Sequence, residues 1–89
     1  FPKKDRYSIG IKCENKTLEL LEEMIRASTR GGREKLRYLI ECDIQLRLVK
    51  VFVRASIDSQ AIKLNHGIQL QKKLQEIGKM LGGWIKSLK

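Results

Sequence analysis

The 89-residue sequence lacks any apolar run long enough to cross a membrane, and it contains a single proline, Pro2. Without about 18 consecutive apolar residues, a transmembrane helix is not expected. There is no secretory signal pattern and no low-complexity segment. Hydrophobic residues still make up 42% of the sequence, which is typical of a globular chain rather than a disordered one. The length suits one helical domain and not two.

Residues that support metal or catalytic chemistry are also scarce. Cys13, Cys42 and His66 are the only cysteines and the only histidine, and their spacing matches no zinc site. Two reduced cysteines in a core are favoured over a disulfide, and this fits the cytoplasm. The pair Gly82-Gly83 follows no strand and lacks the Gly-Lys-Ser continuation of a phosphate loop. We therefore expect a non-enzyme without metal or cofactor.

The composition has many more basic than acidic residues. Nineteen Lys and Arg residues against ten Asp and Glu residues give a formal net charge of +9. This balance favours a polyanionic partner: nucleic acid, an acidic protein surface or an anionic membrane. A basic domain with no such partner is the alternative. Aromatic residues are only 6% of the chain, so backbone recognition is favoured over base stacking.

Three helical periods follow one another, and they predict helices over about 8–30, 33–64 and 66–88. Ser8 and Asn65 are candidate N-caps, and Gly31-Gly32 is the expected stop of the first helix. Apolar residues recur at steps of three and four in each helix. The three stripes are Cys13, Thr17, Leu20, Met24 and Ala27; Leu39, Cys42, Leu46, Val49 and Val53; and Leu70, Leu74, Ile77, Leu81, Trp84 and Leu88.

The first two helices carry a second apolar face, which is typical of helices placed between partners. Those faces are Leu18, Leu21 and Ile25, and Leu36, Ile40, Ile44, Leu48, Phe52 and Ala55. Amphipathic helices joined by short turns predict an all-α, antiparallel up-down bundle.

Glycines interrupt the last helix at Gly78, Gly82 and Gly83. The apolar pattern resumes at Trp84, so we expect the helix to continue through them, although termination at Gly82-Gly83 is the alternative. Gly78 and Gly82 share a face, which would allow another helix to approach closely. Trp84 is predicted to be a core or interface anchor.

Two segments resemble a known four-helix-bundle superfamily: Phe1–Gly10, which opens Phe-Pro-Lys-Lys, and Glu76–Ser87, with Ile-Gly-Lys-Met-Leu-Gly-Gly-Trp-Ile. The superfamily contains the accessory variability determinant proteins of diversity-generating retroelements. It also contains the proteins encoded in intervening sequences of bacterial 23S ribosomal RNA genes. The Leu-Gly-Gly-Trp-Ile ending resembles the retroelement group. The Pro-Ser-Asn-Ile-Ala-Glu-Gly stretch of the other group is absent, and Leu18–Arg26 stands in its place.

The resemblance implies a homopentameric barrel of four-helix bundles, with no catalytic activity of its own. It implies binding of template RNA and of a reverse transcriptase, in support of mutagenic reverse transcription. In that family the Phe-Pro follows an N-terminal helix, which the sequence lacks; we expect three helices of the four here. The predicted RNA contacts are Arg6, Arg47, Lys50, Arg54 and Lys79.

Two alternatives remain open from the sequence. One is a structural bundle of the intervening-sequence type with no established activity. The other is a toxin–antitoxin-like or membrane-surface helical peptide. Arg47, Lys50 and Arg54 also fit an ordinary solvated helical surface.

Overall fold

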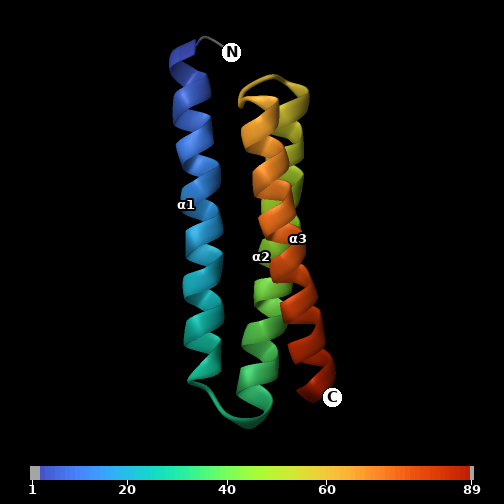
Figure 1. The fold of residues 1–89 in the computed structure, drawn as a ribbon. Coiled ribbons are helices and arrows are strands. Elements are labelled where there is room, and N and C mark those ends of the chain that lie inside the picture. Colours follow the sequence, from blue (N-terminus) through green and yellow to red (C-terminus); the bar gives the residue numbers. More distant parts are fainter. Residues whose placement is uncertain (1–2, 89) are drawn as a thin grey trace.

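The three predicted apolar stripes become three antiparallel helices (Figure 1). The computed structural model describes residues 3–88, and the side chains of residues 8–88. The helices are α1 (Lys3–Ser28), α2 (Gly32–Asp58) and α3 (Leu64–Leu88). They run side by side along a rod 47 Å long, and no strand occurs in the part of the chain described. The all-α prediction is confirmed.

The core runs along the middle of the rod and is built from the predicted stripes. Leu39, Leu74 and Leu81 are fully buried, as are Cys13 and Val53. Thr17, the polar member of the α1 stripe, donates its hydroxyl to the carbonyl oxygen of Cys13 at 2.9 Å. A buried hydroxyl that is hydrogen-bonded in this way adds no unsatisfied group to the core.

Two helix starts differ from the expected ones. Because α1 already begins at Lys3, Ser8 lies inside it rather than at its N-cap. The chain can become helical directly after Pro2, since proline is tolerated before or within a first turn. At the other site α3 begins at Leu64, so Asn65 lies in the first turn and is not the cap.

The end of the second helix was predicted too late, near 64, whereas α2 ends at Asp58. Ser59 and Gln60 then form a turn, and Gln60 has a φ of 59°. Serine favours turns, whereas a positive φ is uncommon for glutamine. Ala61 and Ile62 fold back onto the end of the core, where they are 1% and 4% exposed. Their apolar side chains extend the helical pattern in sequence although their backbone is not helical.

The first helix ends at Ser28, three residues before the predicted stop at Gly31-Gly32, and Gly32 is the first residue of α2 rather than the C-terminal residue of α1. Gly32 has a φ of +58°, a conformation that glycine adopts without the clash of a Cβ. Gly31 has an extended backbone and is the N-cap of α2, with no side chain to cap it.

Within this chain the helices bury one face each. α2 packs against both α1 and α3, whereas α1 and α3 meet much less. The second faces of α1 and α2 stay open: Leu18 and Ile25 are 56% and 66% exposed, and Leu48 is 59% exposed. The prediction of two covered sides on α2 is therefore not met by the residues described.

Candidate nucleic-acid interface

One of the predicted RNA contacts, Lys50, lies at the junction of α2 and α3, beside the residue that precedes Lys79. Gly78 packs against α2 so closely that a Cβ built there would lie 3.4 Å from Nζ of Lys50. Lys79 follows Gly78 and is exposed. A residue without a side chain thus lets the Lys50 amine approach the helix that carries Lys79.

Further lysines extend this surface along α3. Lys72 and Lys86 lie seven residues before and after Lys79, which is two helical turns, so the three share one face. All three are exposed. We call the set Lys50, Lys72, Lys79 and Lys86 the lysine face. Lys72 and Lys86 were not among the predicted RNA contacts, although their spacing of seven from Lys79 was readable in the sequence.

Arg54 adjoins the lysine face because it is one turn beyond Lys50 on α2, and it is exposed. Arg47 has a partner: its guanidinium lies 3.1 Å from the carboxylate of Asp43. That carboxylate compensates the charge of Arg47, so Arg47 is the weaker candidate for a phosphate. The side chain of Arg6 lies outside the described residues.

The predicted packing residues divide into two groups. Gly78 and Trp84 are half-buried; Gly78 meets Leu46, and Trp84 packs against the core with the Lys35 amine 5.5 Å from its ring centroid. Gly82 and Gly83 are exposed, and a Cβ on either would meet nothing within 4 Å. The helix continues through both glycines, as predicted. The close approach at Gly82 remains a prediction about another chain.

The two cysteines and the one histidine are placed by packing and by an ion pair. Burial raises the pKa of the Cys13 and Cys42 thiols, so both stay protonated at neutral pH, and both are free. His66 pairs with Glu14 at 2.8 Å and ties α3 to α1. Among the described residues no group of three His, Cys, Asp or Glu side chains could hold a metal. None of the described helices is long and apolar enough to span a membrane.

The model of one protein family, described as bAvd-like, matches residues 1–88. The chain belongs to the bAvd-like family. This is the family of the bacterial accessory variability determinant, and it confirms the resemblance carried by the two end segments. No curated protein and no solved structure matches the chain.

Membership of the bAvd-like family selects between the two groups that the sequence resembles. It supports an accessory role in a diversity-generating retroelement rather than a place among the ribosomal intervening-sequence proteins.

Proposed function

We propose that this bAvd-like chain is a non-catalytic subunit that binds the template RNA and the reverse transcriptase, and so supports mutagenic reverse transcription. The observation that carries the proposal is the lysine face with Arg54 beside it. None of these five cations forms an ion pair with a residue that the structure describes. Cations without protein partners are free to replace the counterions of a phosphate backbone.

The chemistry of the surface favours backbone contacts over base reading. Lysine acts on phosphate as a point charge on a flexible stem, without the fixed geometry that reads a base edge. Trp84, the one tryptophan, is half-buried against the core and leaves little ring surface for stacking. Affinity for structured RNA with little sequence preference is the expected behaviour.

The proposal includes a four-helix bundle in which a further helix covers the open face of α1. Glu14 and Leu18 are one turn apart, and Glu14 bonds His66 of α3, so this face is on the α3 side. Leu18, Leu21 and Ile25 continue it as an exposed apolar row. An antiparallel helix laid along this row would remove the largest apolar exposure on α1 from water.

Assembly into a homopentamer is the other part of the proposal. Five copies would repeat the lysine face around one axis and would carry 5 × 9 = 45 formal positive charges. Fields from repeated faces add and raise the association rate with polyanions. An RNA that spans several copies would then gain affinity from each face it reaches.

The test is RNA binding by the double variant Lys50→Ala/Lys79→Ala at several salt concentrations. Each phosphate contact adds about 0.7 to 0.9 to the slope of log affinity against log salt concentration. With five contacts per subunit, the wild-type affinity for RNA should therefore fall by about 50- to 150-fold between about 100 and about 300 mM salt. The variant should bind RNA more weakly at low salt. Its plot of log affinity against log salt concentration should be less steep by the contribution of about two phosphate contacts.

The matched control is Lys12→Ala/Lys63→Ala, which removes the same charge from exposed lysines away from the lysine face. It should lower the affinity much less. Equal losses in the two variants, or an affinity indifferent to salt, would refute the lysine face as the RNA surface. Co-purification tests binding of the reverse transcriptase. If the two proteins do not co-purify, the reverse transcriptase is removed from the proposal.

A further inference from the structure

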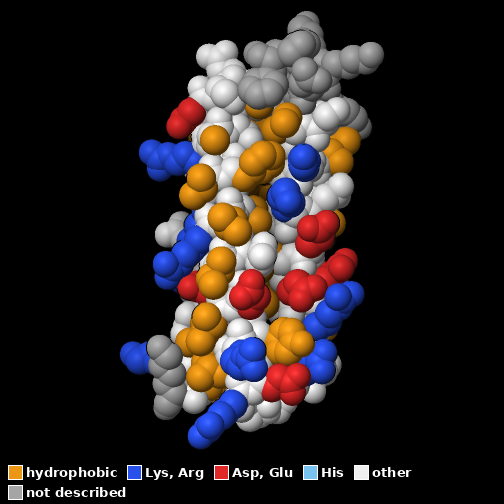
Figure 2. All heavy atoms as spheres, turned by 180° about the vertical axis from the view of Figure 1, so that it is seen from behind, with side chains coloured by type: hydrophobic (Ala, Val, Ile, Leu, Met, Phe, Trp, Pro, Cys, Tyr) orange, Lys and Arg blue, Asp and Glu red, His pale blue; other side chains and the backbone are white. Residues whose placement is uncertain are grey.

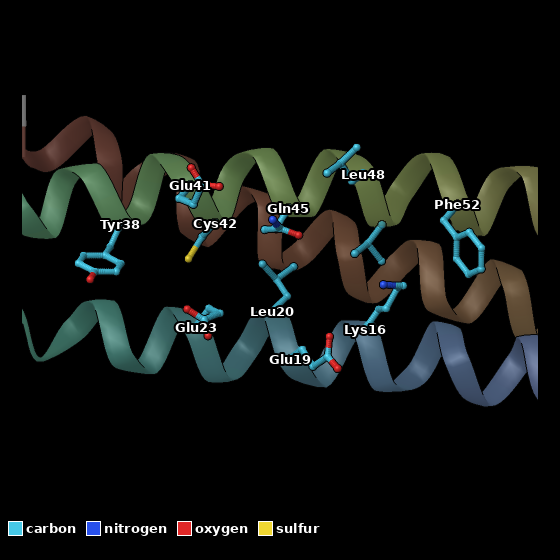
Figure 3. Close-up of a pocket in the computed structure, with 11 residues that line it drawn as sticks. Lys16, Glu19, Leu20, Glu23, Tyr38, Glu41, Cys42, Gln45, Leu48 and Phe52 are labelled. Atoms are coloured by element: carbon cyan, nitrogen blue, oxygen red, sulfur yellow. The ribbon is translucent and has the colours of Figure 1, made fainter.

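A groove of about 540 Å³ runs between α1 and α2. Leu20, Cys42 and Val49 of the core form its floor. Tyr38 and Phe52 stand at its two ends on α2, as Figure 3 shows. Leu48 lines the groove and is 59% exposed, so apolar surface continues to the rim.

The rim of the groove is acidic, which is unusual in a chain of net charge +9. Glu19 and Glu23 line it from α1 and Glu41 from α2, with Lys16 as the cation among the lining residues. Arg37 lines the adjoining hollow with Glu41, so the two α1 carboxylates are the rim carboxylates farther from an arginine of α2. Figure 3 shows the two α1 carboxylates along one wall with Glu41 opposite. Figure 2 shows acidic side chains gathered beside a column of hydrophobic side chains. An apolar floor with this rim suits a helix that carries apolar residues flanked by cations.

The chain itself carries such a surface on the outer side of α2. We call it the arginine stripe, and its members recur at steps of four and three along one face. Ile40, Ile44 and Val51 are its apolar members, 43%, 46% and 68% exposed. The members in order are Arg33, Arg37, Ile40, Ile44, Arg47 and Val51.

The arginine stripe and the groove lie on neighbouring sides of the same helix. Leu48 is one turn from Ile44 and lines the groove, so it joins the two surfaces. The groove is also distinct from the open apolar face of α1. Glu19 and Glu23 line the groove, whereas Glu14, which continues the apolar row of α1, points to α3.

We propose that the arginine stripe of a second copy of this chain docks in the acidic groove. Ile44 and Val51 of that copy contact Leu48 and the groove floor, while its Arg37 and Arg47 lie near the carboxylates of the rim. Arg47 exchanges its partner Asp43 for a rim carboxylate, which costs little because an ion pair four residues apart on a helix surface contributes little to stability. Since two different surfaces meet, the contact is heterologous and repeats from copy to copy into a ring if the rotation closes. This inference deepens the assembly part of the proposed function and rests on it.

Charge reversal tests the contact on the full chain. The groove variant Glu19→Lys/Glu23→Lys places cations on both surfaces, and the stripe variant Arg37→Glu/Arg47→Glu places carboxylates on both. Each should lower the mass seen by light scattering to that of the monomer. The variant with all four changes exchanges the two signs and restores the net charge of +9, so it should assemble again.

Glu22→Lys/Glu76→Lys is the matched control for the groove variant, because both residues are exposed and neither lines the groove. It should assemble like the wild type. Circular dichroism checks that every variant keeps its helices, and the recovery in the four-fold variant excludes simple misfolding. A monomeric wild type, an unaffected groove variant or a four-fold variant that stays monomeric overturns the proposal.

The outcome separates this inference from the proposed function. A groove variant that keeps its mass but loses the reverse transcriptase would show that the polymerase occupies the groove, and the second copy would be ruled out. RNA binding is read separately with Lys50→Ala/Lys79→Ala, whose cations lie outside both docking surfaces. If the wild-type chain assembles but does not bind RNA, the proposed function is refuted and the docking contact is not.

Discussion

At the scale of the residue, glycines inside α3 serve opposite purposes. Gly67 is buried, and a Cβ built there would overlap the Ile57 side chain and lie 3.1 Å from Cδ1 of Ile62. Gly83 is exposed, and a Cβ there would meet nothing within 4 Å. The first glycine makes room for the end of the core, whereas the second only weakens the helix as far as this chain is concerned.

Gly67→Ala should therefore lower the free energy of unfolding by about 1–3 kcal/mol, because the added methyl group overpacks the site. Gly83→Ala should raise it by about 0.5–1 kcal/mol, because alanine is the better helix former and fills open space. Urea unfolding followed by circular dichroism measures both changes. A loss of stability at Gly83 would contradict the view that this position is open.

At the scale of the element, the turn between α1 and α2 depends on two adjacent glycines with different duties. Gly32 has a positive φ, while Gly31 is an N-cap in extended conformation with no side-chain hydrogen bond. A side chain at Gly32 is strained by its backbone alone, since no neighbouring atom lies within 4 Å of the added Cβ. A side chain at Gly31 instead offers the cap that α2 lacks.

Gly32→Ala should destabilise the fold by about 1–2 kcal/mol, the usual penalty for an L-residue in the left-handed region. Gly31→Ser should stabilise it by a few tenths of a kcal/mol, because its hydroxyl can accept a hydrogen bond from a free N–H of the first turn. Thermal unfolding of the two variants measures the difference. Two effects of the same sign would show that the turn is not built as described.

Helix existence was readable from sequence because the buried stripes repeat without interruption from Cys13 to Ala27 and from Leu70 to Leu81. Helix ends were harder to predict, since Ala61 and Ile62 are apolar at positions that suit a helix but are buried by a loop. The meeting of Lys50 with Gly78 depends on how α3 lies against α2, which no local pattern encodes. Lys72 and Lys86 became site residues only once that packing showed which face of α3 they extend.

At the scale of the whole molecule, the positive net charge lowers the stability of the fold but favours RNA binding. A net charge of +9 on 89 residues repels itself in the folded state, and salt screens that repulsion. The ion pairs that salt would weaken are exposed, Arg26–Glu23 and Arg47–Asp43 among them, and such pairs contribute little. Salt should therefore stabilise the fold over the range in which it weakens RNA binding.

The two charge-reversal variants differ in net charge, so salt should change their free energies of unfolding by different amounts. The groove variant carries 9 + 4 = 13 formal positive charges and the stripe variant 9 − 4 = 5, and neither is expected to assemble. The free energy of unfolding in urea, which is uncharged, should rise between about 50 and about 300 mM salt in both, since the Debye length shrinks from roughly 14 to 6 Å. The rise should be larger for the groove variant, because repulsion grows with net charge. A fall in either variant would mean that local ion pairs outweigh the self-repulsion of the chain, whereas equal rises would mean that salt stabilises the fold independently of net charge.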